Sequence, residues 1–224
     1  MISIVIPTLN AAKTLPLSLA ALAPAAMDGL VRELIIVDGG SSDDTAAIAD
    51  EAGARFEQAA PGRGGQLRYG CDLAKGPWLL ILHADTRLSV DWEADAIRHM
   101  RQSPDQAAYF RFQLDDDRFI ARIWEAGVAA RCAMFGLPYG DQGLLIRKAV
   151  YEAAGGYRDL ALMEDVDLVR RLGRKRLLAL KARALTNADR FRARGYWHRS
   201  LCNWGLLLRY WFGADPKVLA KAYG

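Results

Sequence analysis

The sequence predicts an α/β fold with a mostly parallel central sheet flanked by helices, and three observations lead to this prediction. Short apolar runs alternate with Ala/Leu-rich segments through the first hundred residues. Two of these runs, 34–37 and 79–82, are apolar at every position, as expected for strands that helices cover on both faces. Polar residues follow directly after three of the runs. Strands that alternate with helices form parallel βαβ units with right-handed crossovers.

The expected elements follow in order along the chain. The first part gives strands at 2–7, 34–38, 55–57 and 78–83, separated by helices at 13–22, 43–52 and 66–75. After residue 90 the alternation weakens, and we expect helices at 90–101, 119–133 and 164–172, a helix near Val150, and strands at 107–113 and 143–147. No linker interrupts the chain. We therefore expect one domain over residues 1–187, followed by a basic, aromatic helical extension over residues 188–224.

The composition favours a soluble protein with a full hydrophobic core. Hydrophobic residues make up 52% of the 224 residues, and no stretch approaches the roughly 20 apolar residues that a membrane span needs. The chain begins directly with the β-rich run 2–6, which indicates a strand rather than a signal peptide. Three scattered cysteines form neither a disulfide framework nor a CxxC metal pair. We therefore expect a cytoplasmic location.

The net charge of +4 is unevenly distributed. From Arg170 onward there are fourteen Lys and Arg and two Asp and Glu, whereas the preceding part has sixteen and twenty-four. The acidic first part argues against nucleic acid as a partner of the whole molecule. The basic end could hold phosphates, lie against anionic lipid or form a solvated surface.

An apolar stripe recurs at helical spacing in the C-terminal extension, at Trp197, Leu201, Trp204, Leu208 and Trp211. Such a stripe could pack on this chain's own core or form a homodimer. Trp beside basic residues also suits a peripheral contact with the inner membrane face, where a lipid-linked acceptor would be found. The sequence leaves these alternatives open.

Polar residues after the first, second and fourth strands predict a ligand site, because the carboxyl ends of parallel strands meet at one edge of the sheet. After the second strand, Asp38 could accept hydrogen bonds from a base or a ribose, and the glycines that follow allow a sharp turn. Ser41 or Ser42 is expected to cap the next helix. After the fourth strand, Asp85 could coordinate Mg²⁺ or Mn²⁺, or simply terminate a turn.

Two further segments carry candidate chemistry. The glycine-rich basic segment 61–66 could cradle phosphate at a helix N-terminus or serve as a flexible connection. It lacks the Lys-Ser/Thr of a P-loop, and no GxGxxG follows the first strand. The acidic segment 164–167 could supply a general base, because like-charge crowding raises a carboxyl pKa. Its acidic residues could also simply complement the helix dipole.

Taken together, these segments resemble the family 2 glycosyltransferases, which have the GT-A mononucleotide-binding fold. Residues 4–10 (IVIPTLN) resemble the opening strand of that family, and 36–45 (IVDGGSSDDT) resemble its VDDGSSDDT segment, with Gly39 at the second Asp. Residues 82–86 (LHADT) occupy the place of the DxD metal motif, with His83 at the first Asp. Glu164-Asp165 resembles the ED pair, and 189–191 (DRF) faintly resembles the (Q/R)xxRW element.

Three segments, LHADT at 82–86, YGDQG at 139–143 and MEDV at 163–166, look closest to a compact bacterial subgroup of this family. Members of that subgroup are often labelled arsenosugar biosynthesis glycosyltransferases. The resemblance implies an inverting transfer of a sugar from a nucleotide sugar, with UDP favoured, to an unidentified hydroxyl acceptor. It implies Asp165 as the general base with Glu164 beside it, and Asp85 as the ligand of Mg²⁺ or Mn²⁺. It places Asp141 and Gln142 near the acceptor. The nucleotide-sugar pocket would include Pro7, Thr8, Asn10, Asp38, Gly40, Ser41, Gly64, Gln66 and Asp85.

Two other functions compete with this interpretation. A nucleotidyltransferase can use a related metal-dependent α/β sheet, but it usually carries a Gly-rich, Lys-bearing loop after the first strand, where this chain has residues 9–12 (LNAA). A non-catalytic nucleotide-sugar-binding module would not need Asp85 and Asp165.

Overall fold

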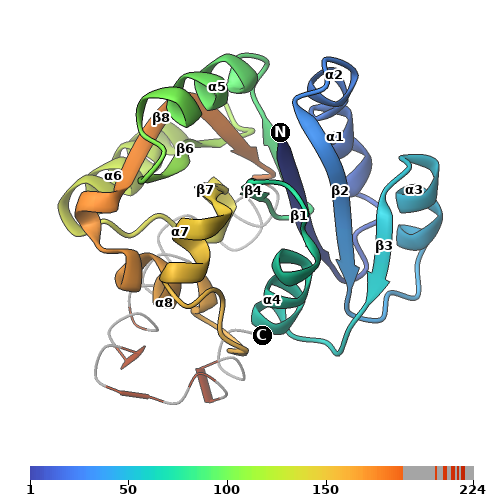
Figure 1. The fold of residues 1–224 in the computed structure, drawn as a ribbon. Helices are drawn as coiled ribbons and strands as arrows, with labels where there is room; N and C mark the ends of the chain where they lie inside the picture. The colour runs from blue at the N-terminus through green and yellow to red at the C-terminus, as the bar shows by residue number, and fades with distance from the viewer. Residues whose placement is uncertain (189–204, 206–208, 211–212, 215, 217, 220–224) are drawn as a thin grey trace.

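The structure is a computed structural model that describes residues 1–188, 205, 209–210, 213–214, 216 and 218–219 (Figure 1). One eight-stranded sheet of order β3-β2-β1-β4-β7-β6-β8-β5 runs through it. The strands are β1 Ile2–Thr8, β2 Val31–Asp38, β3 Arg55–Gln58, β4 Trp78–Ile81, β5 Thr86–Leu88, β6 Ala107–Leu114, β7 Leu144–Arg147 and β8 Leu177–Thr186. The helices are α1 Leu15–Ala20, α2 Ala23–Met27, α3 Thr45–Glu51, α4 Arg63–Leu73, α5 Trp92–Gln102, α6 Phe119–Phe135, α7 Lys148–Ala153 and α8 Glu164–Leu172, with 3₁₀ turns η1 Gly140–Gln142 and η2 Arg174–Arg176.

The sheet has a parallel half and a mixed half. Strands β3, β2, β1 and β4 are all parallel to their neighbours. Strand β7 runs antiparallel to β4 and β6, β8 runs parallel to β6, and β5 runs antiparallel to β8. Four of the seven neighbouring pairs are parallel, which confirms the predicted mostly parallel α/β sheet.

Helices cover both faces of the parallel half (Figure 1). Ile4 and Ile6 of β1 belong to a core with residues of α1, α2, α3 and α5. Val5 between them packs in a second core with residues of α4, α7 and α8. Because neighbouring residues of a strand point to opposite faces, both faces of β1 are buried, which explains its apolar composition. At Gly70 of α4 an added Cβ would lie 2.6 Å from Val5 Cγ1, so this glycine lets the helix sit close to the sheet.

Several boundaries differ from the prediction. The expected helix 13–22 consists of two short helices, α1 and α2, and each has a proline in its first turn. Helix α4 begins at Arg63, so the glycine-rich segment is mostly its first turn. Strands β5 and β8 were not predicted. Strand β8 alternates buried and exposed residues, and most of its exposed positions are polar or basic, so it lacks the apolar run of the first strands.

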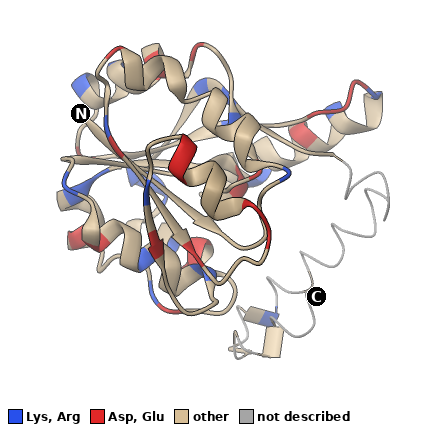
Figure 2. Ribbon diagram, turned by 90° about the vertical axis from the view of Figure 1, so that its right-hand side faces the viewer, with Lys and Arg blue, Asp and Glu red and all other residues tan. Residues whose placement is uncertain are grey.

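The predicted C-terminal features lie largely outside the described residues. The five members of the apolar stripe and the DRF segment 189–191 all belong to the part that the structure does not describe. Within the described residues, no helix combines the length and apolarity that crossing a membrane would take. Acidic and basic residues are interspersed over the helices and loops of the ribbon (Figure 2).

Candidate functional site

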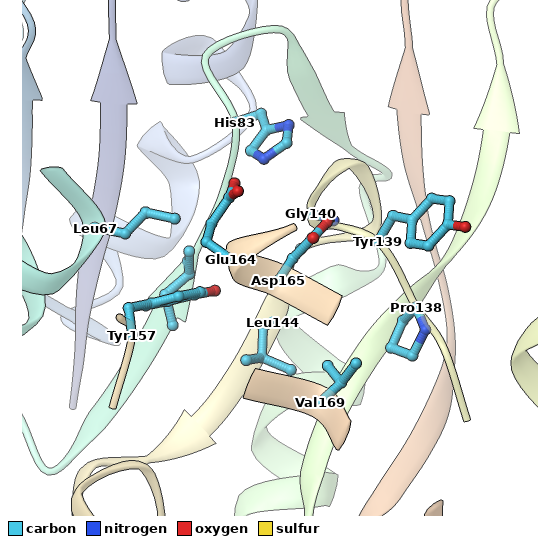
Figure 3. A pocket seen from close by; sticks show the side chains of 12 residues that line it. Leu67, His83, Pro138, Tyr139, Gly140, Leu144, Tyr157, Glu164, Asp165 and Val169 are labelled. Carbon is cyan, nitrogen blue, oxygen red and sulfur yellow. The ribbon is translucent and has the colours of Figure 1, made fainter. Parts of the chain in front are cut away.

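A cavity of about 670 Å³ opens where the loops after β1 and β4, the starts of α4 and α8, η1 and the end of β8 meet. Its volume falls in the ~300–1,000 Å³ range of small-molecule sites. The predicted site residues that line it are Pro7, Thr8, Asn10, Gln66, Asp85, Asp141, Glu164 and Asp165. The predicted site residues outside its lining are Asp38, Gly40, Ser41, Gly64 and Gln142. A small recess continues from the cavity beneath His83 and Glu164 (Figure 3).

Asp38 closes β2 with its carboxylate turned into the protein. The side chain is 1% exposed, and Oδ2 accepts hydrogen bonds from the backbone of Gly40 and Ser41 at 2.8 and 2.7 Å. Oδ1 accepts from the hydroxyls of Thr8 and Ser41. Burial opposes ionisation, but these bonds, those of Ser41 foremost, outweigh it and lower the pKa of Asp38. In this placement Asp38 organises the turn, and its predicted role as a direct ligand stays a prediction.

The loops after β1 and β2 are bonded to each other. Asn10 donates from its backbone to Ser41 Oγ at 2.7 Å, and its Oδ1 accepts from the backbone of Ser42 at 2.9 Å. Ala11 likewise donates to Thr45 Oγ1 at 2.9 Å. The predicted serine cap is wrong, because α3 begins at Thr45 and Ser41 is instead bonded to the buried Asp38 and to Asn10. The polar residues of both loops therefore fix the shape of this wall of the cavity.

Gln66 and Gly64 of α4 hold elements together at the same edge. The amide nitrogen of Gln66 donates to the carbonyl oxygens of Thr8 and Val37 at 2.9 and 2.8 Å, which ties β1 to β2. A Cβ on Gly39 would lie 3.3 Å from this amide, so Gln66 fills the space beside Gly39. A Cβ on Gly64 would lie 2.5 Å from the carbonyl oxygen of Arg158. Gly64 therefore allows α4 to pack against the segment that leads into α8.

Asp85, the predicted ligand of a divalent cation, lines the cavity. Within the described residues, no group of three His, Cys, Asp or Glu side chains could hold a metal by itself. One carboxylate still fits Mg²⁺ or Mn²⁺ when substrate phosphates and water complete the shell, which is how Mg²⁺ commonly binds at phosphate sites. Burial, and then the positive charge of Arg63, lowers the pKa of the neighbouring His83 to about 3, so its imidazole is neutral at pH 7.

Glu164 begins α8 and points toward His83 (Figure 3). It is 1% exposed, and its Oε1 lies 3.4 Å from Nε of Arg63, an ion pair that lacks hydrogen-bond geometry. Burial, and then the negative charge of Asp165, raises the pKa of Glu164 to about 7, while Arg63 opposes the rise. A carboxyl group with this pKa can gain or lose a proton near neutral pH.

Asp165 is held by two backbone amides. Its Oδ2 accepts from Gly140 at 2.6 Å and its Oδ1 from Val166 at 2.7 Å. Gly140 must be glycine, because a Cβ there would collide with the ring of His83. Met163 precedes the pair with φ of 67°, and Asn10, with φ of 51°, is the other non-glycine residue with positive φ in the described part. Both line the cavity, which fits the tendency of strained backbone to gather at functional sites.

The predicted acceptor-side residues separate into two roles. Asp141 lines the cavity. Gln142 is 1% exposed, and it donates to the carbonyl oxygen of Phe110 at 3.1 Å and accepts from the backbone of Tyr139 at 3.3 Å. The guanidinium of Arg131 lies 3.6 Å from the centre of the Tyr139 ring. Gln142 therefore fastens the loop that carries Asp141 to β6.

Several residues that line the cavity were not among the predicted site residues, and three of them stand out by their contacts. Arg63, His83 and Gly140 each contact the catalytic candidates or line the cavity. Each lies inside a segment that the sequence already marked, namely 61–66, 82–86 and 139–143. Their specific contacts join segments far apart in the chain, so spacing alone could not reveal them.

Comparison with known proteins places this arrangement in a family. Residues 3–131 match the model of glycosyl transferase family 2, which is more than half of the chain. A PGL/p-HBAD biosynthesis glycosyltransferase of Mycobacterium tuberculosis is 40% identical over 110 residues, covering 43% of this chain and 39% of that relative. An uncharacterized glycosyltransferase of Rickettsia felis is 35% identical over 86 residues, covering 38% of this chain and 30% of that relative. The matched region thus spans about two fifths or less of these relatives.

Solved structures share the fold at low sequence identity. TarS 1–349 of S. aureus superposes with a TM-score of 0.66 at 16% identity, covering 84% of this chain and 60% of that chain. Glucosyl-3-phosphoglycerate synthase from Mycobacterium tuberculosis, in complex with Mn²⁺, UDP and phosphoglyceric acid, gives 0.57 at 22% identity, covering 84% and 68%. These similarities confirm the predicted GT-A type of fold. Because the family model matches more than half of the chain and the fold is shared, the chain belongs to glycosyl transferase family 2.

Proposed function

We propose that this chain transfers a sugar from a nucleotide sugar to a hydroxyl acceptor, with inversion at the anomeric carbon. The observation that carries the proposal is the meeting of Asp85, Glu164 and Asp165 in one cavity, walled by the β1 loop. Family membership and the Mn²⁺, UDP and UDP-GlcNAc complexes of its structural neighbours support a nucleotide-sugar donor, with UDP as the favoured nucleotide. The arsenosugar subgroup stays a prediction, because five curated relatives carry the PGL/p-HBAD name and the Rickettsia felis relative is an uncharacterized glycosyltransferase.

In this mechanism the acceptor hydroxyl attacks the anomeric carbon from the face opposite the nucleoside diphosphate. Asp165 accepts the hydroxyl proton as the new glycosidic bond forms and the bond to the diphosphate oxygen breaks. The amides of Gly140 and Val166 orient the Asp165 carboxylate, and each oxygen keeps a second lone pair for the proton. A divalent cation on Asp85 would stabilise the negative charge that develops on the leaving diphosphate.

The proposal does not identify the acceptor, and it names only the residues near which an acceptor hydroxyl would bind. Asp141 lies in the η1 turn, directly after Gly140, whose backbone donates to Asp165, and its place in the same cavity suits contacts with an acceptor hydroxyl. A lipid-linked acceptor, a peripheral membrane contact and a homodimer each depend on the C-terminal residues outside the described part, and they stay proposals. A cytoplasmic location is likewise a proposal.

Titration of the protein with UDP, in the presence and absence of Mn²⁺, tests the donor and metal sites together. We expect Mn²⁺ to raise the affinity of the wild-type protein for UDP and to have no effect on the affinity of the Asp85→Ala variant. Asp91→Ala, which removes an exposed carboxylate outside the cavity, is the matched control. The same Mn²⁺ effect in Asp85→Ala would remove Asp85 from the metal role, and no binding of any nucleoside diphosphate would refute the donor assignment.

A further inference from the structure

One face of the sheet in the mixed half carries a cluster of basic side chains. The exposed residues of β8 alternate with buried ones, so they point to one side of the sheet. Arg111 of β6 is the register partner of Arg183. Arg87 of β5 is the register partner of Leu185, which lies two residues beyond Arg183 on the same side of β8. We call this surface the basic sheet face, and its basic residues are Arg87, Arg111, Lys181 and Arg183.

The positive charges of the basic sheet face are not neutralised by neighbouring carboxylates. Three of its basic residues are exposed, and Arg87 is partly exposed. The ion pairs among the described residues involve none of the four, and the guanidinium of Arg183 donates to the neutral Gln113 at 3.3 Å. The like charges of the register partners Arg111 and Arg183 repel each other. An anionic partner would therefore relieve this repulsion.

Two partners that this chain itself could provide have the wrong charge. The residues that follow β8 include four arginines and one aspartate between positions 189 and 204, so their net charge has the same sign as the face. A second copy bound symmetrically through this face would bring two sets of the same four cations together. Both arrangements would add to the repulsion. The face therefore suits an anionic partner other than this chain.

An exposed apolar side chain at the border of the face favours a lipid surface over a nucleic acid. Val90 is 100% exposed, and the preceding Ser89 is bonded to the backbone of Arg183 twice, at 2.9 Å each. An apolar side chain beside cations can enter the boundary between lipid headgroups and acyl chains. A single-stranded nucleic acid would instead use aromatic side chains for base stacking, and the exposed residues of β6 and β8 include none.

We propose that the basic sheet face binds the surface of a membrane that contains anionic phospholipids. The inference does not rest on the proposed sugar transfer, and the surface is separate from the apolar stripe of the C-terminal extension. Arg183 lies three residues before Thr186, which lines the cavity, so about 10 Å of strand separates the face from the cavity. Lipid binding at this face therefore holds the cavity close to the membrane surface.

Co-sedimentation of the full chain with vesicles measures this binding. We expect the wild-type protein to bind vesicles of phosphatidylcholine and phosphatidylglycerol, more weakly at high salt, and not vesicles of phosphatidylcholine alone. Each basic residue near an anionic lipid surface contributes about fivefold, so the double variant Lys181→Gln, Arg183→Gln should bind about 25-fold more weakly. The matched control is Arg32→Gln, Lys75→Gln, which removes two exposed cations from the parallel half and should bind like the wild type.

Several results would overturn the inference. If the wild-type protein does not bind the anionic vesicles at low salt, the face is not a lipid-binding surface, and binding of single-stranded RNA in its place would identify a nucleic acid partner. Wild-type affinity in Lys181→Gln, Arg183→Gln would assign lipid binding to another part of the chain. Equal weakening in the control variant would show that binding follows net charge alone. If the first double variant does not fold, Arg87→Gln, Arg111→Gln removes the other two cations and should weaken binding by a similar factor.

Discussion

The two walls of the cavity use polar residues in different ways. In the loops after β1 and β2, polar side chains bond to one another and to the backbone, and the Asp38 carboxylate accepts four such bonds. Around the start of α8, carboxylates are crowded together, one of them has its pKa raised to about 7, and Met163 holds positive φ. The first wall is stabilised by its polar groups, whereas the second keeps charged groups in an unfavourable setting. This difference indicates that the loops after β1 and β2 fix the shape of the cavity, whereas the start of α8 carries the groups suited to catalysis.

The largest expected effect is catalytic and belongs to the α8 wall. Asp165→Asn should lower turnover by about 10² to 10⁴, the usual contribution of a general base, and leave the affinity for the nucleotide sugar unchanged. The amide oxygen of Asn can still accept the hydrogen bond from Gly140, so the loop should keep its position. Steady-state kinetics and titration with the donor check both parts. Wild-type turnover in Asp165→Asn, together with loss of turnover in Glu164→Gln, would move the base to Glu164.

The next effect is on stability and belongs to the loop wall. Asp38→Ala should lower the free energy of unfolding by on the order of 4 kcal/mol, because two backbone amides and two hydroxyls lose a charged acceptor. Asp44→Ala, which removes an exposed carboxylate that makes no cap bond in the same loop, should change it by less than about 0.5 kcal/mol. Urea unfolding of the three proteins measures this. Equal destabilisation by the two variants would show that the Asp38 network does not hold the loops together.

The pH dependence of stability tests the unfavourable setting of Glu164 at the start of α8. The pKa of Glu164 is about 7 in the folded protein and ordinarily 4.5, so between these values the folded state holds a proton that the unfolded state lacks. The contribution of Glu164 to the free energy of unfolding therefore falls as the pH rises from about 4.5 to about 7 and does not recover above it. At about 1.4 kcal/mol per pKa unit, the loss is on the order of 3 kcal/mol.

Glu164→Gln removes this titration and leaves the other groups in place. The stability of the wild-type protein relative to Glu164→Gln should therefore decrease between pH 5 and pH 8, measured by urea unfolding at both values. Asp38 contributes in the opposite direction, because its pKa is lowered and its contribution is lost as the pH falls through the acidic range. A difference between wild type and Glu164→Gln that does not vary with pH would contradict the buried, proton-holding state of Glu164.

The same division explains what the sequence could predict. In the parallel half, helices separate β1, β2, β3 and β4 along the chain, so local periodicity located these strands and the polar residues at their ends. In the mixed half, β8 pairs with β5 across about a hundred residues, as in Arg87 with Leu185, and no local pattern records that pairing. The same holds for the site, where local motifs could be predicted and contacts between distant segments could not. The glycosyltransferase resemblance predicted Asp85, Glu164 and Asp165 as site residues, and all three line the cavity, but the contacts of Arg63 with Glu164 and of Gly140 with His83 depend on the folded chain.

The smallest expected effect concerns the two serines between β2 and α3, which look alike in the sequence. Ser41 donates to Asp38 and accepts from Asn10, so it joins both loops, whereas Ser42 is exposed and is held mainly through its backbone amide. Ser41→Ala should therefore cost about 1 kcal/mol of unfolding free energy, the value of a typical hydrogen bond, and Ser42→Ala less than about 0.5 kcal/mol. A helix cap at Ser42 would reverse this order, because a capping serine is worth about 1 kcal/mol. Urea unfolding of the two variants therefore distinguishes bonding between the loops from the helix cap that the sequence predicted at Ser41 or Ser42.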